Sequence, residues 1–366
     1  NQDISASDIY NNRLRYTPKK NENGSLYATI EFLVSDGLAY SATTNTITVN
    51  VTAVNDAPVL TSSAPSAVSV NEDSANSTAV SLGLSSLTYG TGGGTDESSQ
   101  TFTYTLTAIP AFINVFKADG STQVNANTSL TLTELQGLKY KTIANANGSG
   151  NLSWTVQDSG GTANGGVDTL SQSLSITVNA VNDAPVASGA ATLAAVLEDT
   201  ANPAGDTVAN LFAANFSDAT DAVSGGSSAN TLAGVLVTAN AASAAQGKWQ
   251  WQASGSWTDI ATSGLSDSAA LFLDASTKLR FLPTANWNGT PGSLTTRLAD
   301  NSGSALTNGS SVNVSTNGGT TPYSTATVVL ATSITAVNDA PVLTSSAPSA
   351  VSVNEDSANS TAVSLG

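Results

Sequence analysis

The hexapeptide V-N-D-A-P-V at Val54–Val59 returns at Val181–Val186 and at Val337–Val342, and this repetition decides how the sequence is divided. The copies begin 127 and 156 residues apart, which suits domains slightly larger than a minimal β-sandwich. Over 32 positions, residues 52–83 are identical to residues 335–366. Such identity indicates a recent duplication, so we expect the chain to come from a longer array of repeats.

The repeat divides the chain into four parts, which are residues 1–53, 54–180, 181–336 and 337–366. The first is expected to be the C-terminal part of one domain, and the second and third to be complete domains. The fourth would begin a further domain, because it is identical to residues 54–83. Residues 301–325 are rich in Ser, Asn, Gly and Thr, which favours an extended hairpin or a loose loop inserted before the last strand of the third part.

Alternating apolar and polar residues indicate strands in every part of the chain. An 11-residue motif, as in Leu138–Gly148, recurs in the first three parts and is followed by such a strand. In the second part this strand places Leu152, Trp154 and Val156 on one face. A period of two residues is typical of antiparallel sheets with one buried face. We therefore predict an all-β fold of tandem antiparallel, Ig-like sandwiches in a linear array, with Trp154 in the core of residues 54–180.

Helical sequence is nearly absent. Short helices are expected only around Val208–Phe216 and near Thr131–Gly137.

The composition excludes several classes of protein. Asp and Glu outnumber Lys and Arg by 27 to 11, and the resulting net charge of −16 argues against binding to nucleic acid or to an anionic membrane. Cys, Met and His are absent, which removes thiol nucleophiles, disulfides, imidazole catalysis and the usual zinc sites. Calcium remains possible because it takes oxygen ligands alone. A chain without oxidisable residues also suits an extracellular location.

Several acidic residues stand where the strand pattern calls for a core residue. Glu72 follows Val68 and Val70 in the same parity, and Glu198 follows Val196. Strands that alternate in the same way end in acids, which are Asp36, Asp158 and Asp300. Burying a carboxylate is costly unless something pairs with it, and no Lys or Arg lies beside these acids in the sequence. A bound divalent cation would offset the repulsion.

At this point the chain resembles the cadherin repeat and the cadherin-like modules of giant bacterial surface adhesins of the RTX type. The linker Ala53–Pro58 looks like the cadherin motif D-x-N-D-N-A-P, and Val156–Gly160 resembles A-x-D-x-G. Ala53, Ala180 and Ala336 depart from the pattern, because they stand where cadherins have the first linker aspartate. Fewer ligands imply one or two ions per junction, held more weakly than in animal cadherins.

The resemblance implies Ca²⁺ sites at three junctions, each built from linker residues and strand-end acids. The site after the second part would use Glu72, Asn182, Asp183, Asp218, Asp221 and Asp300. The preceding junction would use Asn55, Asp56, Asp96 and Asp158. The last would use Glu198, Asn338 and Asp339. The alternative is a plain turn with strand-end caps, since Asn, Asp and Pro are ordinary turn residues.

The resemblance further implies a non-enzymatic extender, or stalk, in an adhesin on a bacterial cell surface, with a role in cell adhesion and biofilms and export by type I secretion. Its partners would be neighbouring repeats of the same chain and other copies of the protein, without nucleic acid and without membrane insertion. Acids that recur in structural register favour ligands over a single catalytic pair.

Two other functions stay open. The domains could assemble laterally into a fibre, sheath or surface layer. Residues 181–336 could instead form a glycan-binding module, because aromatic faces stack on sugars and Trp249, Trp251 and Trp257 lie close together in the sequence. Cross-strand packing, with Trp257 opposite the other two, is the commoner use of such a cluster.

Overall fold

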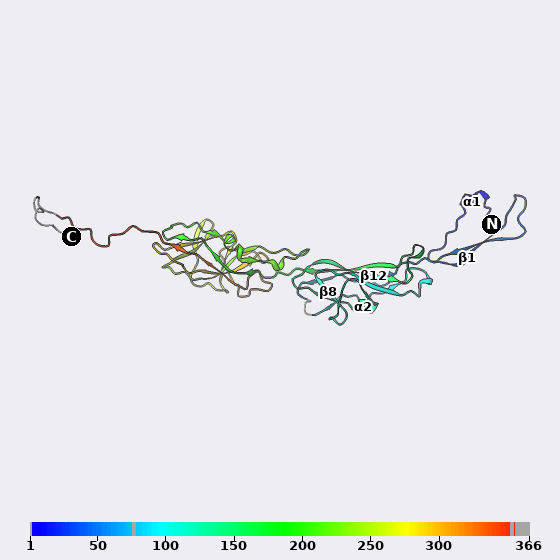
Figure 1. Cartoon of the computed structure of the whole chain (residues 1–366), viewed down its shortest axis with the longest axis horizontal. Coiled ribbons are helices and arrows are strands. Elements are labelled where there is room, and N and C mark those ends of the chain that lie inside the picture. The colour runs from blue at the N-terminus through cyan, green and yellow to red at the C-terminus, as the bar shows by residue number, and fades with distance from the viewer. Residues whose placement is uncertain (1, 75–77, 352–354, 356–366) are drawn as a thin grey trace. The chain divides into compact units, whose positions relative to one another are not determined.

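A computed structural model describes residues 2–74, 78–351 and 355 (Figure 1). The chain forms two compact units, which are treated separately below. Unit 1 comprises Asn1–Asp183 with Ala219–Ala229, and unit 2 comprises Ala184–Asp218 with Asn230–Gly366. In the described part of the chain, no helix has the length and apolar character needed to cross a bilayer. Of the further domain expected at residues 337–366, residues 352–354 and 356–366 lie outside the described residues.

The first sandwich, in unit 1, consists of two main sheets around one core. Its larger sheet has the strand order β10 (Thr128–Leu130), β7 (Phe102–Ala108), β12 (Gly148–Asp158), β13 (Thr169–Asn179) and β4 (Val68–Asn71). Its smaller sheet has the order β5 (Val80–Ser81), β11 (Lys139–Thr142), β8 (Ile113–Phe116) and β9 (Gln123–Val124). A separate short pair joins β3 (Val59–Leu60) to β6 (Tyr89–Gly90). The prediction of an all-β sandwich is thus confirmed.

The alternation in β12 works as the sequence predicts. Leu152, Trp154 and Val156 are buried and the residues between them are not. Trp154 retains only 1% of its surface, and its indole Nε1 donates a 2.9 Å hydrogen bond to the hydroxyl of Tyr89. The polar atom of this large core side chain is therefore satisfied, as buried polar groups generally are.

One strand pair of the larger sheet is parallel, with Ile176 of β13 opposite Val68 of β4. The chain thus enters and leaves this sandwich in the same direction. Asn55 bonds to Val167 just before β13 begins, whereas Val181 bonds to Glu72 just after β13 ends. The two linkers of this sandwich therefore lie at opposite ends of β13, which is 11 residues long and spans roughly 35 Å.

The N-terminal part of unit 1 is a hairpin of β1 (Gly24–Phe32) and β2 (Asn45–Val51), preceded by the one-turn helix α1 (Ala6–Tyr10). Ser5 caps α1 through a bond from the Asp8 amide. The sequence did not predict this helix. The hairpin leaves several large apolar side chains exposed, including Leu26 and Phe32, because no second sheet covers it.

The second sandwich, in unit 2, has a six-stranded and a four-stranded sheet. The first has the order β15 (Ala190–Thr192), β26 (Val328–Ala331), β24 (Leu294–Asp300), β19 (Leu232–Asn240), β22 (Ala270–Asp274) and β25 (Ser311–Val312). The second has the order β17 (Asp206–Thr207), β23 (Lys278–Pro283), β20 (Gly247–Ala253) and β21 (Ser256–Asp259). Short pairs join β14 (Val186–Ala187) to β18 (Phe216–Ser217), and β16 (Val196–Leu197) to β27 (Ile334–Thr335). Parallel pairing again links early to late strands, β15 with β26 and β16 with β27.

The two helices expected from the sequence are present and short. In α2 (Leu132–Gln136), Thr131 and Glu134 form a reciprocal capping box. In α3 (Val208–Phe212), the Thr207 hydroxyl caps the first turn, and a 3₁₀ turn continues to Asn215.

The insertion at residues 301–325 packs onto the six-stranded sheet, whereas the sequence favoured an extended hairpin or a loose loop. It contributes β25, which pairs with β22. Val314 is fully buried there in a small second core with Leu236, Phe272 and Ala299. The sheet face that would otherwise meet solvent is therefore covered by the insertion.

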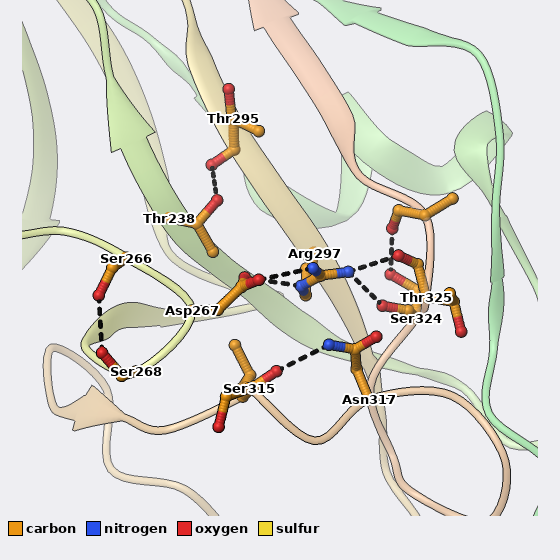
Figure 2. A network of polar contacts seen from close by, with 12 residues as sticks. Thr238, Ser266, Asp267, Ser268, Thr295, Arg297, Ser315, Asn317, Ser324 and Thr325 are labelled. Carbon is orange, nitrogen blue, oxygen red and sulfur yellow. Dashed lines mark hydrogen bonds and ion pairs between the residues drawn. The ribbon is translucent and has the colours of Figure 1, made fainter.

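Arg297 of β24 ties this insertion to the sheet (Figure 2). Its guanidinium donates two 2.8 Å bonds to the carboxylate of Asp267, and it also donates to the carbonyls of Ser324 and Thr325. Such a bidentate pair fixes the direction of the side chain as well as its charge.

The tryptophan hairpin differs from the expected aromatic cluster. Trp249 is buried and packs edge-on against Phe281 with ring centroids 5.3 Å apart. Trp257 stands opposite Gln252 across the β20–β21 turn, so it lies on the other face from Trp249. It stacks instead under the guanidinium of Arg280, which is 4.0 Å from its ring centroid. The register of this turn, with two positive-φ residues at its tip, separates the tryptophans.

Candidate calcium sites at the ends of the sandwiches

Glu72 closes the C-terminal end of the first sandwich. It lies just past β4, at the end of the parallel pairing with β13, and only 4% of its surface is exposed. Its Oε1 accepts a 2.7 Å bond from the amide of linker residue Val181, and its Oε2 accepts a 3.2 Å bond from Nδ2 of Asn147. The carboxylate thus holds the outgoing linker against the sheet.

Asn147 is a residue that sequence reasoning passed over. Asn147 also forms two bonds with Ser227. Its side-chain amide donates to the Ser227 hydroxyl at 2.9 Å, and its Oδ1 accepts from the Ser227 backbone amide at 2.7 Å. It occupies the tenth place of the 11-residue motif, and Asn23 and Asn288 occupy that place in the other copies. This recurrence was the available signal.

Asp183 and Asp221 meet within unit 1. The Asp183 amide donates a 3.0 Å bond to Oδ1 of Asp221, which is buried in a 3₁₀ turn. Burial raises the pKa of Asp183 above its ordinary value, and repulsion from the carboxylates of Asp221, Asp73 and Glu72 raises it further. A raised carboxyl pKa means that ionisation disfavours this arrangement at neutral pH, and that a proton or a cation would relieve it.

The N-terminal end of the first sandwich is organised around Asn55. Its Nδ2 donates to Oδ1 of Asp158 at 3.0 Å and to the carbonyl of Val167 at 2.7 Å. Its Oδ1 accepts a 2.6 Å bond from Nε2 of Gln100. Asp158 ends β12 on the inward parity and is 6% exposed, as its place in the alternation predicts. Linker and sheet are thus joined through one amide side chain.

At this end Glu97, rather than Asp96, faces the linker. Glu97 is 3% exposed, and it accepts a 2.7 Å bond from the Asp56 amide and a 2.8 Å bond from the Gly93 amide. Asp96 is exposed. The two acids are neighbours in a 3₁₀ turn, where successive side chains point about 120° apart, so only one of them can face the linker.

Two oxygens beside Asn55 have no hydrogen-bond donor although they are buried. They are Oδ2 of Asp158 and Oε1 of Gln100. Buried acceptors are normally paired, and a carboxylate oxygen is among the most costly to leave unpaired. Both belong to side chains that already contact Asn55 through their other atom. An oxygen-only donor set with unused acceptors fits a hard cation such as Ca²⁺.

The second sandwich repeats part of this arrangement within unit 2. Asp218 and Asp300, both predicted ligands, are 5% and 3% exposed. Asp218 Oδ2 accepts from the Asn230 amide, and Asp300 Oδ1 accepts from the amide and hydroxyl of Ser302. Oδ2 of Asp300 is buried without a donor, as is Oδ2 of Asp158 at the corresponding strand end.

Glu198 closes the C-terminal end of the second sandwich in the same way as Glu72 closes the first. It accepts a 2.7 Å bond from the Val337 amide and a 2.9 Å bond from Nδ2 of Asn288. These two bonds hold the pKa of Glu198 below its ordinary value. Of the predicted ligands at this junction, Asn338 and Asp339 are exposed. Asn182, predicted for the other junction, is half-buried beside Asp183.

Across the described residues, no three Asp or Glu side chains are grouped closely enough to hold a metal ion by themselves. A cation at any of these ends would therefore also draw on amide and backbone oxygens, which calcium accepts readily.

No protein-family model matches the chain, and no curated protein matches it either. Among solved structures, it is similar to the protocadherin gamma B2 extracellular cadherin domains 1–5, with 15% identity, a TM-score of 0.38, and coverage of 85% of this chain and 46% of that one. It is also similar to mouse cadherin-23 EC22-24, with 12% identity, a TM-score of 0.34, and coverage of 84% and 74%. An endo-fucoidan hydrolase of glycoside hydrolase family 107 has 14% identity and a TM-score of 0.21, with coverage of 87% and 35%. The chain spans less than half the length of the first of these. Likenesses this distant do not place it in a family.

Proposed function

We propose that this chain is a non-enzymatic segment of an extracellular repeat protein, in which calcium at the ends of the sandwiches stiffens the linkers. The segment would serve as an extender in adhesion, on a bacterial cell surface, as part of a large adhesin exported by type I secretion. Linkers at opposite ends of β13 support this proposal, because a spacer needs each sandwich to add its length to the chain.

The observation that carries the proposal is the pair of donorless oxygens around Asn55. Asn55 belongs to the linker, whereas Asp158 belongs to the sheet and Gln100 to the loop before β7. A cation bound to Asp158 Oδ2 and Gln100 Oε1 would add metal–oxygen bonds at the point where linker and sandwich already meet. Bending at that linker would then require breaking metal bonds.

The residues that would hold calcium, together with further backbone oxygens, are those whose hydrogen bonds join linker and sandwich at each end. For the first sandwich they are Asn55, Asp56, Glu97, Gln100 and Asp158 at the N-terminal end, and Glu72, Asp183 and Asp221 at the other. Bound calcium supplies positive charge that offsets the mutual repulsion of these carboxylates.

The test is calcium titration of the whole 366-residue chain by calorimetry, with and without the substitution Asp158→Asn. Extracellular modules bind calcium with dissociation constants of about 0.1 to 1 mM, so 10 mM calcium should stabilise a bound sandwich by about 1 to 3 kcal/mol. We expect Asp158→Asn to remove one binding event, because the amide keeps the shape but loses the charge.

The matched control is Asp168→Asn. Asp168 lies at the same end of the sandwich, but its two carboxylate oxygens already accept from Gln157 and Thr169. Its replacement should leave the stoichiometry unchanged. A wild-type chain that releases no binding heat, or an Asp158→Asn chain with full stoichiometry, would overturn the proposal.

A further inference from the structure

A pocket of about 350 Å³ in unit 2 lies beside the edge of the four-stranded sheet. Most of its wall is apolar, formed by residues such as Val196, Leu197, Pro203 and Ala204. Leu197 at its rim keeps 54% of its surface exposed. The one basic residue of the lining is Arg280 of β23.

Arg280 is buried to an unusual degree for an arginine, with 6% of its surface exposed. Its Nε donates a 2.8 Å bond to Oε1 of Gln250. Its Nη1 donates to Oδ1 of Asn202 and, at 3.3 Å, to the carbonyl of Pro203. The indole of Trp257 covers one face of the guanidinium. All of these partners are neutral.

None of the ion pairs in the described residues includes Arg280. Arg297, in the same sandwich, shows the usual arrangement, with the carboxylate of Asp267 bound to it from two sides. A buried cation without a counter-charge is costly, and in a chain with 27 acidic residues a partner was easily available. Burial also lowers the pKa of Arg280 below its ordinary value. The guanidinium of Arg280 can therefore still bind a negatively charged group.

The remaining nitrogen, Nη2, makes no hydrogen bond to the described residues. It keeps some exposure to solvent. Since Arg280 lines the pocket and its Nε and Nη1 are already bonded, Nη2 is the guanidinium nitrogen left for a ligand there. Asp206 also lines this pocket, and its Oδ1 accepts bonds from the Thr207 amide and from Nδ2 of Asn210, at the start of α3.

We propose that this pocket binds the carboxylate of an organic acid with an aliphatic body, the carboxylate on Nη2 of Arg280 and the apolar part against Val196, Leu197 and Ala204. An inorganic anion would satisfy the guanidinium but would leave the apolar wall wet. A purely structural role, clamping Asn202 and Pro203 to the sheet, accounts for Nε and Nη1 but not for Nη2 or for the pocket. The proposal does not depend on calcium binding.

The test uses the whole chain and follows the Arg Nε–H and Trp Nε1–H signals by NMR while sodium hexanoate is added at constant ionic strength. The Arg280 and Trp257 signals should shift and saturate, whereas those of Arg297, which is already paired, should stay in place. Hexanol, which has the same body without the charge, and sodium sulfate, which has charge without the body, should each produce shifts at least tenfold smaller at equal concentration.

Two variants separate the pocket from the clamp. Ala204→Phe should fill the pocket and weaken hexanoate binding at least tenfold, while the Arg280 Nε–H signal remains visible without ligand because the clamp is kept. The Arg280→Lys variant lacks the Arg280 Nε–H group, so the signal that disappears in it is assigned to Arg280. Acetyl-glutamate amide represents an acidic side chain of a protein, and hexanoate represents a free acid. The compound that binds more tightly identifies the source of the carboxylate. Equal shifts with hexanol, or no saturable shift with either acid, would overturn the proposal.

Discussion

At the scale of single residues, the same three groups recur at the C-terminal end of both sandwiches. A glutamate accepts from a linker amide and from an asparagine, as Glu72 does from Val181 and Asn147. The aspartate next to the glutamate accepts a bond from the backbone amide of the residue two places before that asparagine. In the first sandwich, Asp73 accepts from the Asn145 amide at 3.2 Å. The contacts of Glu198 and Asp199 are the same. Such repetition indicates a structural latch that both sandwiches carry.

Replacing Asn288 by Ala should destabilise the second sandwich by about 1 to 3 kcal/mol, because the substitution leaves Oε2 of Glu198 buried without a donor. Chemical denaturation of the whole chain measures this loss. Since the Asn288 bond helps to lower the pKa of Glu198, its stabilising effect is present above the ordinary value of 4.5 and is lost as pH falls through the folded pKa.

The difference between wild type and variant should therefore be largest at neutral pH and should shrink in acid. The control is Asn151→Ala, an exposed strand residue, which should change stability by less than about 0.5 kcal/mol. A variant penalty that stays constant from pH 7 to pH 3 would contradict the assignment to Glu198.

The sequence could predict which acids lie near the sandwich ends but not which oxygens turn inward. Parity along β4 and β12 places Glu72 and Asp158 correctly, because a strand alternates strictly. The choice between Asp96 and Glu97 depends on the phase of a single 3₁₀ turn, which no periodic pattern reveals. Gln100 carried no signal, since a lone glutamine in a loop has no distinctive spacing.

At the scale of secondary-structure elements, the insertion at residues 301–325 is the part that the sequence described least well. Its apolar residues are too few and too irregularly spaced to indicate a packed segment; they are Leu306, Val312, Val314 and Tyr323. This small core buries few apolar side chains, and the hydrogen bonds of Arg297 add to its hold on the insertion (Figure 2). The strands and the two capped helices were predictable because alternation and N-cap residues are local features.

The substitution Asp267→Asn should loosen the insertion. Arg297 holds the pKa of Asp267 below its ordinary value of 3.8, so the pair stabilises above that pH and is lost as pH falls through the folded pKa. Because Asp267 is partly exposed, the expected loss is only about 1 kcal/mol, or roughly fivefold faster amide exchange, at Ser324 and Val314.

The control for this exchange measurement is Lys248→Gln. It removes an ion pair with Asp259 in which both side chains are largely exposed. Exchange at Ser324 and Val314 should then match wild type. If Asp267→Asn also left their exchange unchanged at neutral pH, the insertion would be held by its apolar core alone.

At the scale of the whole molecule, the two complete sandwiches have separate hydrophobic cores. Trp154 lies in one and Trp249 in the other, each fully buried with its indole nitrogen bonded, to Tyr89 and to the carbonyl of Gly292. Separate cores predict separate cooperative transitions.

Differential scanning calorimetry of the whole chain should therefore resolve two transitions, and each tryptophan variant should move one of them. Trp154→Ala and Trp249→Ala should each cost about 3 to 5 kcal/mol, which lowers the affected midpoint by roughly 10 °C. Each variant is the control for the other. A single transition, or two transitions that shift together in both variants, would mean that the cores unfold as one.

Each asparagine that binds a latch glutamate is followed by glycine, as Asn147 is by Gly148 and Asn288 by Gly289. The glycine cannot be exchanged cheaply, because its φ is +140° in one copy and +123° in the other. An asparagine before glycine is also where side-chain amides lose ammonia most readily, since nothing shields the following backbone nitrogen. Deamidation would place a new carboxylate against Glu72 or Glu198 and turn attraction into repulsion. Deamidation at Asn147 or Asn288 would therefore loosen the contact between a sandwich and its outgoing linker.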